Sequence, residues 1–156
     1  LDNDGRLHVY REHYKERTRT AEHADIIKDL SSGESFLWTV ADHDAGERAE
    51  LESRGLRTEK AMKDIREGVQ AVKNRLATQN DGRPRLFFFS NLANTLSEIY
   101  DYVWRESRDG ANSREEPVKE NDHAMDALRY MVMAVDKGGG GKPKVSSVNG
   151  EDGRWK

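Results

Sequence analysis

The chain has 156 residues, 35% of them charged, with a formal net charge of −3 and no cysteine. This length suits one domain with a buried core, and the lack of thiols excludes disulfides, thiolate zinc sites and thiol catalysis. No apolar run approaches the length that spans a membrane and no signal peptide is visible, so we expect a soluble, intracellular protein.

Apolar periodicity predicts strands that alternate with helices along the chain. Residues 35–41 are almost continuously apolar and rich in β-favouring side chains, which favours an inner strand covered on both faces. Alternating strands and helices are typical of a layered α/β domain. The strands are expected near 6–14, 35–41, 56–58 and 85–89, and the helices near 20–30, 46–54, 61–76, 92–104 and 122–135.

Residues 137–156 are rich in glycine, lysine and serine and show no periodicity. This composition indicates a disordered tail. We therefore assign the folded domain to residues 1–136.

Basic residues gather in two parts of the chain. They outnumber acidic residues by eight to four from Arg57 to Arg85, and by five to two from Lys137 to the end. Local basic patches of this kind can contact phosphates, although a solvated surface is their usual role.

The final predicted helix carries acidic residues at its start. Asp122, His123 and Asp126 occupy its first turn, and an apolar stripe runs along another face. Asp126 lies inside the helix beside this stripe, where a rigidly held carboxylate suits a hard-metal ligand. Two structural roles remain open: Asp122 as the N-cap, and Asp126 in an i,i+3 ion pair with Arg129 on a solvated face.

A second candidate carboxylate, Asp42, directly follows the apolar run at 35–41. In open α/β sheets, ligands bind at the carboxyl ends of the strands. An aspartate in a turn also hydrogen-bonds its own backbone, so a structural role for Asp42 stays open. Carboxylates that converge from distant parts of a sheet, here Asp42 and Asp126, hold Mg²⁺ or Mn²⁺ for phosphodiester hydrolysis. The sequence contains no GxxxxGK[ST] loop and so offers no basis for an ATPase.

Five short segments occur in an order that resembles a known family, at residues 40–42, 51–56, 61–69, 102–104 and 122–130. The most specific of them is Asp-His-Ala-Met-Asp-Ala-Leu-Arg-Tyr at 122–130. Together they resemble the C-terminal nuclease domain of the large terminase subunit of tailed bacteriophages and prophages, and the similarity covers residues 1–135.

The resemblance implies a ribonuclease-H-like α/β fold, in which a sheet is flanked by helices. It implies an endonuclease that cuts concatemeric double-stranded DNA during genome packaging, with two Mg²⁺ or Mn²⁺ ions. It also implies double-stranded DNA, a small terminase subunit and a portal as partners, in the host bacterial cytoplasm and without a membrane.

Matched position by position, the resemblance implies that Asp42 and Asp126 are catalytic carboxylates and that His123 and Lys63 lie near the metals. We expect Asp42, Asp126 and His123 to be catalytic, Asp42, Asp126 and Asp122 to bind metal, and Lys63 and Arg129 to bind DNA. We expect the carboxylates of Asp42 and Asp126 to lie within about 4–8 Å of each other, with His123 bordering the same cleft.

The family's first catalytic aspartate has no counterpart in this sequence. That residue sits on the first strand of the family's sheet, whereas residues 1–5 read as a strand end that enters a hairpin turn. We therefore expect an N-terminally truncated domain without its first strands, and an incomplete site that cuts weakly or not at all. Two other hypotheses stay open: a non-catalytic prophage remnant that binds DNA or other proteins, and another ribonuclease-H-like nuclease of the transposase or resolvase type.

Overall fold

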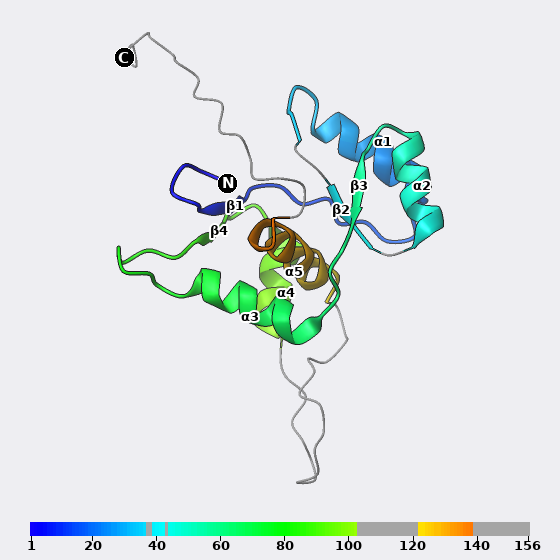
Figure 1. Cartoon of the computed structure of the whole chain (residues 1–156). Coiled ribbons are helices and arrows are strands. Elements are labelled where there is room, and N and C mark those ends of the chain that lie inside the picture. The colour runs from blue at the N-terminus through cyan, green and yellow to red at the C-terminus, as the bar shows by residue number, and fades with distance from the viewer. Residues whose placement is uncertain (37–38, 43, 103–121, 139–156) are drawn as a thin grey trace, which may run out of the picture.

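The structure, a computed structural model, describes residues 1–36, 39–42, 44–102 and 122–138 (Figure 1). Strands and helices alternate along the chain, which confirms the predicted mixed α/β class. The strands are β1 (Leu7–Val9), β2 (Thr39–Ala41), β3 (Thr58–Lys60) and β4 (Leu86–Phe88), and the helices are α1 (Thr20–Leu30), α2 (Ala45–Ser53), α3 (Ile65–Leu76), α4 (Ala93–Asp101) and α5 (His123–Asp136). The predictions for residues 37–38, 43, 103–121 and 139–156, which include most of the tail, lie outside the described residues.

Local capping determines where two of the helices begin. The Asp44 carboxylate accepts a hydrogen bond from the backbone N–H of Glu47 at 2.8 Å, and α2 starts directly after Asp44. Asp64 accepts in the same way from the backbone N–H of Glu67 at 2.8 Å. Because of this cap, α3 begins at Ile65 and not at residue 61, where apolar spacing predicts its start.

Within the described residues the strands form two separate parallel pairs (Figure 1). β1 pairs with β4, with Leu7 opposite Leu86, and β2 pairs with β3, with Thr39 opposite Thr58. No ladder joins the two pairs in this part of the chain. The single ribonuclease-H-like sheet that the resemblance implies is therefore not confirmed, whereas short parallel sheets flanked by helices are.

β1 is shorter than predicted, because its partner β4 is also short. It ends at Val9 and not near residue 14, and the N–H of Phe89 donates the last bond across the pair to the Val9 carbonyl at 3.0 Å. The next side chains then turn toward a different segment. Tyr10 and Arg11 both donate hydrogen bonds to Glu34, at 2.8 Å each.

β2 is half-buried and not covered on both faces. Its three residues are intermediate in exposure, and Phe36, shortly before it, is 53% exposed. α5 packs against β2, but a strand covered on both faces needs a packed element on each side. The prediction of an inner strand at 35–41 is therefore wrong for the residues that the structure describes.

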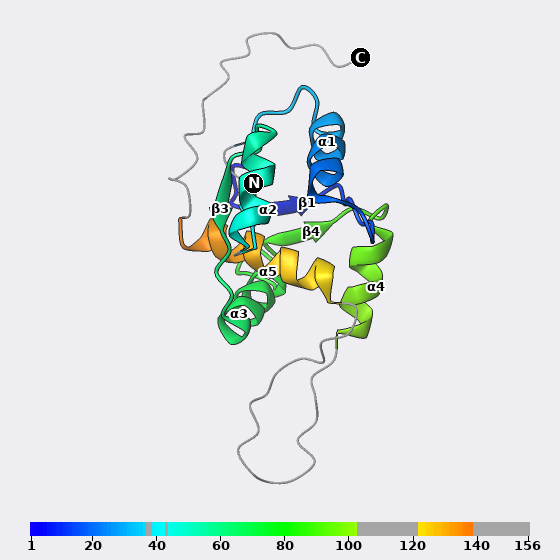
Figure 2. The same ribbon diagram turned by 90° about the vertical axis from the view of Figure 1, so that its right-hand side faces the viewer.

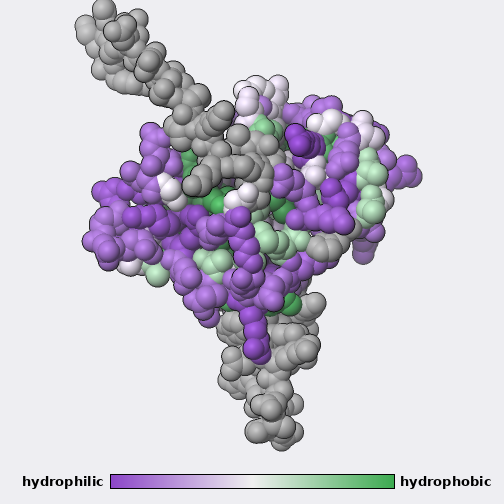
Figure 3. Space-filling model, viewed as in Figure 1, coloured by the Kyte–Doolittle hydropathy of each residue, from purple (hydrophilic) through white to green (hydrophobic). Residues whose placement is uncertain are grey.

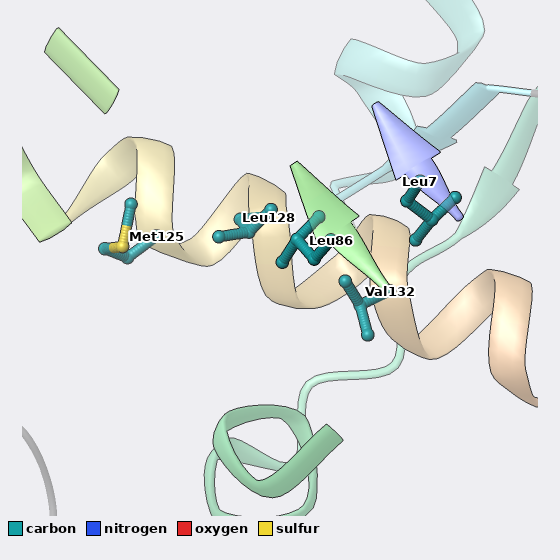
Figure 4. Packing of buried hydrophobic residues seen from close by; sticks show 5 residues of the cluster. All are labelled: Leu7, Leu86, Met125, Leu128 and Val132. Atoms are coloured by element: carbon teal, nitrogen blue, oxygen red, sulfur yellow. The ribbon is translucent and has the colours of Figure 1, made fainter. Parts of the chain in front are cut away.

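The core lies where α5 crosses β1 and β4 (Figure 4). Buried apolar side chains meet there from Leu7, Leu86, Met125, Leu128 and Val132. Burial of a side chain of this size stabilises a fold by about 2 kcal/mol. The apolar stripe predicted for the final helix is confirmed at Leu128 and Val132, whereas Ala127 on the same helix is exposed.

A glycine lets α3 approach α5 closely. A Cβ atom at Gly68 would lie 3.2 Å from the Cβ and 3.3 Å from the Cδ of Arg129, so the arginine side chain occupies the space that any larger residue at 68 would need. Near the far end of both helices, the Nε of Arg75 donates a hydrogen bond to Asp136 at 2.9 Å. α5 is thus held against α3 at its middle and at its C-terminal end.

α1 and α2 pack on each other beside the β2–β3 pair, away from the core (Figures 1 and 2). Arg54, directly after α2, donates a hydrogen bond to Asp25 of α1 at 2.5 Å. On the face drawn in Figure 3 hydrophilic residues predominate, and hydrophobic residues gather toward its middle. Each helix in the described part of the chain is too short or too polar to cross a membrane.

Candidate functional site

A cavity of about 540 Å³ opens beside the carboxyl end of β2 and the first turns of α5. All three predicted catalytic residues line it: Asp42, His123 and Asp126. Asp42 and Asp126 are separated by most of the chain in sequence, so the fold is what brings them to one cavity. The expected separation of about 4–8 Å between their carboxylates stays a prediction.

The parallel β2–β3 pair brings Asp42 and Lys63 together. The chain leaves both strands at the same edge, where Asp42 follows β2 and Lys63 lies three residues after β3. The two side chains form an ion pair. The hydrogen bond with Asp42 raises the pKa of Lys63, and the charges of Asp42, Tyr130 and Asp126 raise it further. Both side chains are about half exposed, so this pair adds little to stability.

Asp126 lies between two partners on its own helix. It forms an ion pair with Arg129, and the hydroxyl of Tyr130 lies 3.5 Å from its Oδ2 atom. Its side chain is 37% exposed. Both oxygens of the Asp126 carboxylate thus have a partner on the same helix, and Asp126 also lines the cavity.

The Tyr130 hydroxyl lies near both Asp42 and Asp126, whose charges affect its pKa. Burial raises the pKa of the Tyr130 hydroxyl, and the charges of Asp126 and then of Asp42 raise it further. The pKa of Lys63 responds to the same two carboxylates. Asp42 and Asp126 therefore lie near the same tyrosine and lysine, and the charges of Lys63 and Arg129 offset theirs.

His123 and Asp122 are placed differently. His123 is exposed and lines the cavity, and its ring lies 6.4 Å from the ring of Tyr14, centroid to centroid. Asp122 precedes α5 as its N-cap residue, but its side chain makes no capping hydrogen bond. Asp122 is also not among the residues that line this cavity. The metal-binding role implied for Asp122 therefore has no support from this geometry.

Arg129 is buried, which gives its expected role in DNA binding no support. Its side chain is only 6% exposed, packed beside Gly68 and paired with Asp126. Its Nε and Nη1 atoms are buried without a hydrogen-bond partner among the described residues. A guanidinium in this position has no surface to offer a phosphate. The i,i+3 ion pair that spacing predicts is present, but not on a solvated face.

Glu98 of α4 was not identified from the sequence, although it touches the start of α5. Its Oε2 atom accepts hydrogen bonds from the backbone N–H groups of Ala124 at 2.8 Å and Met125 at 3.1 Å. Glu98 is 5% exposed, and Leu92 and Thr95 on the same face of the helix are also buried. A glutamate on the buried face of an amphipathic helix is the signal that could have identified it.

The carboxylate oxygens at the cavity are ligands of the type that a hard divalent cation prefers. Mg²⁺ is usually bound by one or two carboxylates, with water and substrate phosphates completing its shell, and Asp42 and Asp126 are two such carboxylates. Each of them contacts a basic side chain, Lys63 for Asp42 and Arg129 for Asp126. Across the described residues, no group of three or more histidine, aspartate or glutamate side chains is arranged to hold one ion.

Comparison with known proteins shows which class of fold the chain has. No protein-family model matches the chain, and no curated protein matches it. A solved structure does match, with a TM-score of 0.73 over 86% of this chain. The mixed α/β chain therefore has a terminase-like fold.

The matching structure is the large terminase from a thermophilic bacteriophage, which is 26% identical to this chain. The match covers 34% of that terminase chain, so the protein described here spans about a third of its length.

Proposed function

We propose that this chain is a metal-dependent endonuclease domain of a phage or prophage large terminase subunit, with a ribonuclease-H-like arrangement of its site. One observation carries the proposal. In a chain with a terminase-like fold, Asp42 at a strand end and Asp126 in the first turn of α5 line one cavity together with His123. The substrate is double-stranded DNA, which a terminase cuts during packaging.

Asp42 and Asp126 would hold the divalent ions, Mg²⁺ or Mn²⁺. When bound, such ions lower the pKa of the attacking water and stabilise the leaving oxygen of the phosphodiester. The two carboxylates come from different parts of the fold, so the end of β2 and the first turn of α5 would together hold the ions. Because both carboxylates are partly exposed, water and phosphate oxygens can complete the coordination.

The remaining residues of the cavity have supporting roles. Lys63 is exposed, and its ammonium group can exchange Asp42 for a DNA phosphate close to the site. Arg129, buried behind Asp126, keeps that carboxylate in position. His123 borders the cavity, where an imidazole can act as a general acid or base. A small terminase subunit and a portal are the partners that this function requires, in the cytoplasm of a bacterial host.

The test compares Mn²⁺ binding and plasmid nicking in the full chain and two variants, Asp42→Asn and Asp126→Asn. Mn²⁺ binding is read from the loss of the free-ion signal in electron paramagnetic resonance. We expect each variant to weaken Mn²⁺ binding by about tenfold or more. Asp101→Asn, on the exposed face of α4, is the matched control and should bind as the unaltered chain does.

We expect the unaltered chain to nick supercoiled plasmid only at a trace level with Mn²⁺, and at a still lower level with Mg²⁺. The described residues offer two carboxylates at the cavity, and Mg²⁺ tolerates an incomplete shell less well than Mn²⁺. Asp42→Asn and Asp126→Asn should remove the trace. Absence of Mn²⁺ binding in the unaltered chain, or full binding and nicking in both variants, would overturn the proposal.

A further inference from the structure

The start of α5 is capped by a residue from another helix. The first N–H groups of a helix have no partner within it, and the N-cap side chain usually accepts from the second or third of them. In α5 these are the N–H groups of Ala124 and Met125, and Asp122 at the cap position binds neither. Glu98 of α4 accepts from both, at 2.8 and 3.1 Å.

The surroundings of Glu98 keep this contact in one geometry. The side chain is buried, and a buried carboxylate is costly unless hydrogen bonds hold it. Its Oε2 atom receives both N–H groups at the positive end of the helix dipole, whereas Oε1 is buried with no hydrogen-bond partner among the described residues. The start of α5, together with the Tyr14 side chain, therefore supplies the hydrogen bonds that hold this buried carboxylate.

α4 is itself anchored in the same way. Glu12, in the segment after β1, accepts hydrogen bonds from the backbone N–H groups of Asn94 at 3.0 Å and Thr95 at 2.9 Å, at the start of α4. The side chains of these two residues also donate to Glu12, at 3.1 and 2.8 Å. A line of carboxylate caps thus runs from the end of β1 through α4 to the first turn of α5.

The same first turn carries the candidate ligands. The N–H of Asp126 donates to the carbonyl of Asp122 at 2.8 Å, so Asp126 is the next residue after the two N–H groups that Glu98 binds. A shift of this turn moves Asp126 and His123 together relative to Asp42, which directly follows β2. We propose that Glu98 is a positioning residue, which holds the first turn of α5 so that Asp126 and Asp42 bind metal jointly.

This inference rests on the proposed function and is tested by metal binding, with Mn²⁺ alone as the probe and the full chain as the protein. We expect Glu98→Ala to lower the Mn²⁺ affinity by about tenfold or more. Glu98→Gln keeps an acceptor oxygen for both N–H groups and should stay within about threefold of the unaltered chain. Urea unfolding shows which variants are folded under the assay conditions.

The matched control is Asp136→Ala, which removes the hydrogen bonds from Arg75 at the opposite end of α5. It loosens the same helix without touching its first turn, so its Mn²⁺ affinity should stay within about threefold of the unaltered chain. A purely structural role for Glu98 predicts equal losses in both variants. Should Glu98→Ala not fold, Glu98→Asp replaces it, because it keeps the charge, shortens the reach and should still lower affinity about fivefold.

Each outcome decides between the two proposals. Mn²⁺ binding in the unaltered chain with no loss in Glu98→Ala overturns the positioning role alone. So does a loss in Asp136→Ala as large as that in Glu98→Ala. Absence of Mn²⁺ binding in the unaltered chain overturns the proposed function, and the positioning role with it. In every case, hydrogen exchange at Ala124 and Met125 reports independently on the cap, since both amides should lose protection in Glu98→Ala.

Discussion

Two basic residues at the candidate site have opposite surroundings. The Lys63 side chain is 43% exposed and pairs with a carboxylate that is itself half exposed. The Arg129 side chain is 6% exposed and lies between α5 and α3. The Lys63 ammonium group is therefore accessible to a phosphate, whereas the Arg129 guanidinium is not.

Salt dependence of DNA binding should separate these two roles. Lys63→Ala should lower the slope of log K against log salt by about 1, because one phosphate contact is lost. Arg129→Ala should leave that slope unchanged but destabilise the chain by about 2 kcal/mol, since it removes buried packing and the partner of a partly exposed carboxylate. Fluorescence anisotropy with a labelled duplex and urea unfolding measure the two effects. An equal fall in slope for both variants would restore Arg129 as a DNA contact.

Helix capping in this fold operates both locally and between elements. Asp44 and Asp64 cap the helices that directly follow them. Glu12 and Glu98 instead cap α4 and α5 from other parts of the chain. A local cap determines where a helix starts, whereas a cap from another element also determines where that helix lies.

Because Glu12 caps α4, the stability of the folded chain should depend on pH in the acidic range. Burial by itself raises the pKa of Glu12, but hydrogen bonds from Thr95 and Asn94 outweigh it, so the pKa lies below its ordinary value of 4.5. A carboxyl with a lowered folded-state pKa stabilises the fold above its unfolded pKa, and this contribution is lost as the pH falls through the folded value.

We therefore expect Glu12→Gln to be less stable than the unaltered chain at neutral pH, and the difference to shrink as the pH falls below 4.5. Urea unfolding of both proteins at several pH values measures the difference in their free energy of unfolding. Ser97→Ala, exposed on α4, is the control and should show the pH dependence of the unaltered chain. A difference that stays constant with pH would show that the Glu12 carboxylate charge does not stabilise α4.

At the scale of the whole molecule, the described residues contain two small sheets and no larger one. Each strand there has a ladder partner on one side, so each pair presents backbone groups along its other edges. Two-stranded sheets are marginal by themselves, and exposed edges can pair with another chain. The helices, chiefly α3 and α5, provide most of the packing in the core.

The chain expressed alone should therefore associate or pack loosely. We expect oligomers in sedimentation and a weak near-ultraviolet circular dichroism signal, because these strand edges have no ladder partner among the described residues and Phe36, Phe89 and Tyr100 are exposed. A lysine placed on an edge, as in His8→Lys on β1, should reduce association, whereas Glu22→Lys on exposed α1 should not. A monomer with cooperative unfolding would contradict this prediction.

The sequence by itself determined the order of the elements and the position of most helices. The helix at 20–30 is predicted with the bounds that α1 has, and the final helix ends within a residue of its predicted end at 135. Asp42 and Asp126 were also identifiable, because a strand end and a helix first turn are local features. Helices are encoded in this way because apolar spacing and caps act over a few residues.

Only the tertiary structure decided the strand lengths, the burial of Arg129 and the contact of Glu98. A strand ends where its partner ends, as Val9 and Phe88 do, and the partner lies far away in sequence. Arg129 is buried because Gly68 admits it beside α3, and Glu98 caps α5 because α4 passes its first turn. Periodicity along one segment carries no information about which other segment lies beside it, and that neighbour determines each of these features.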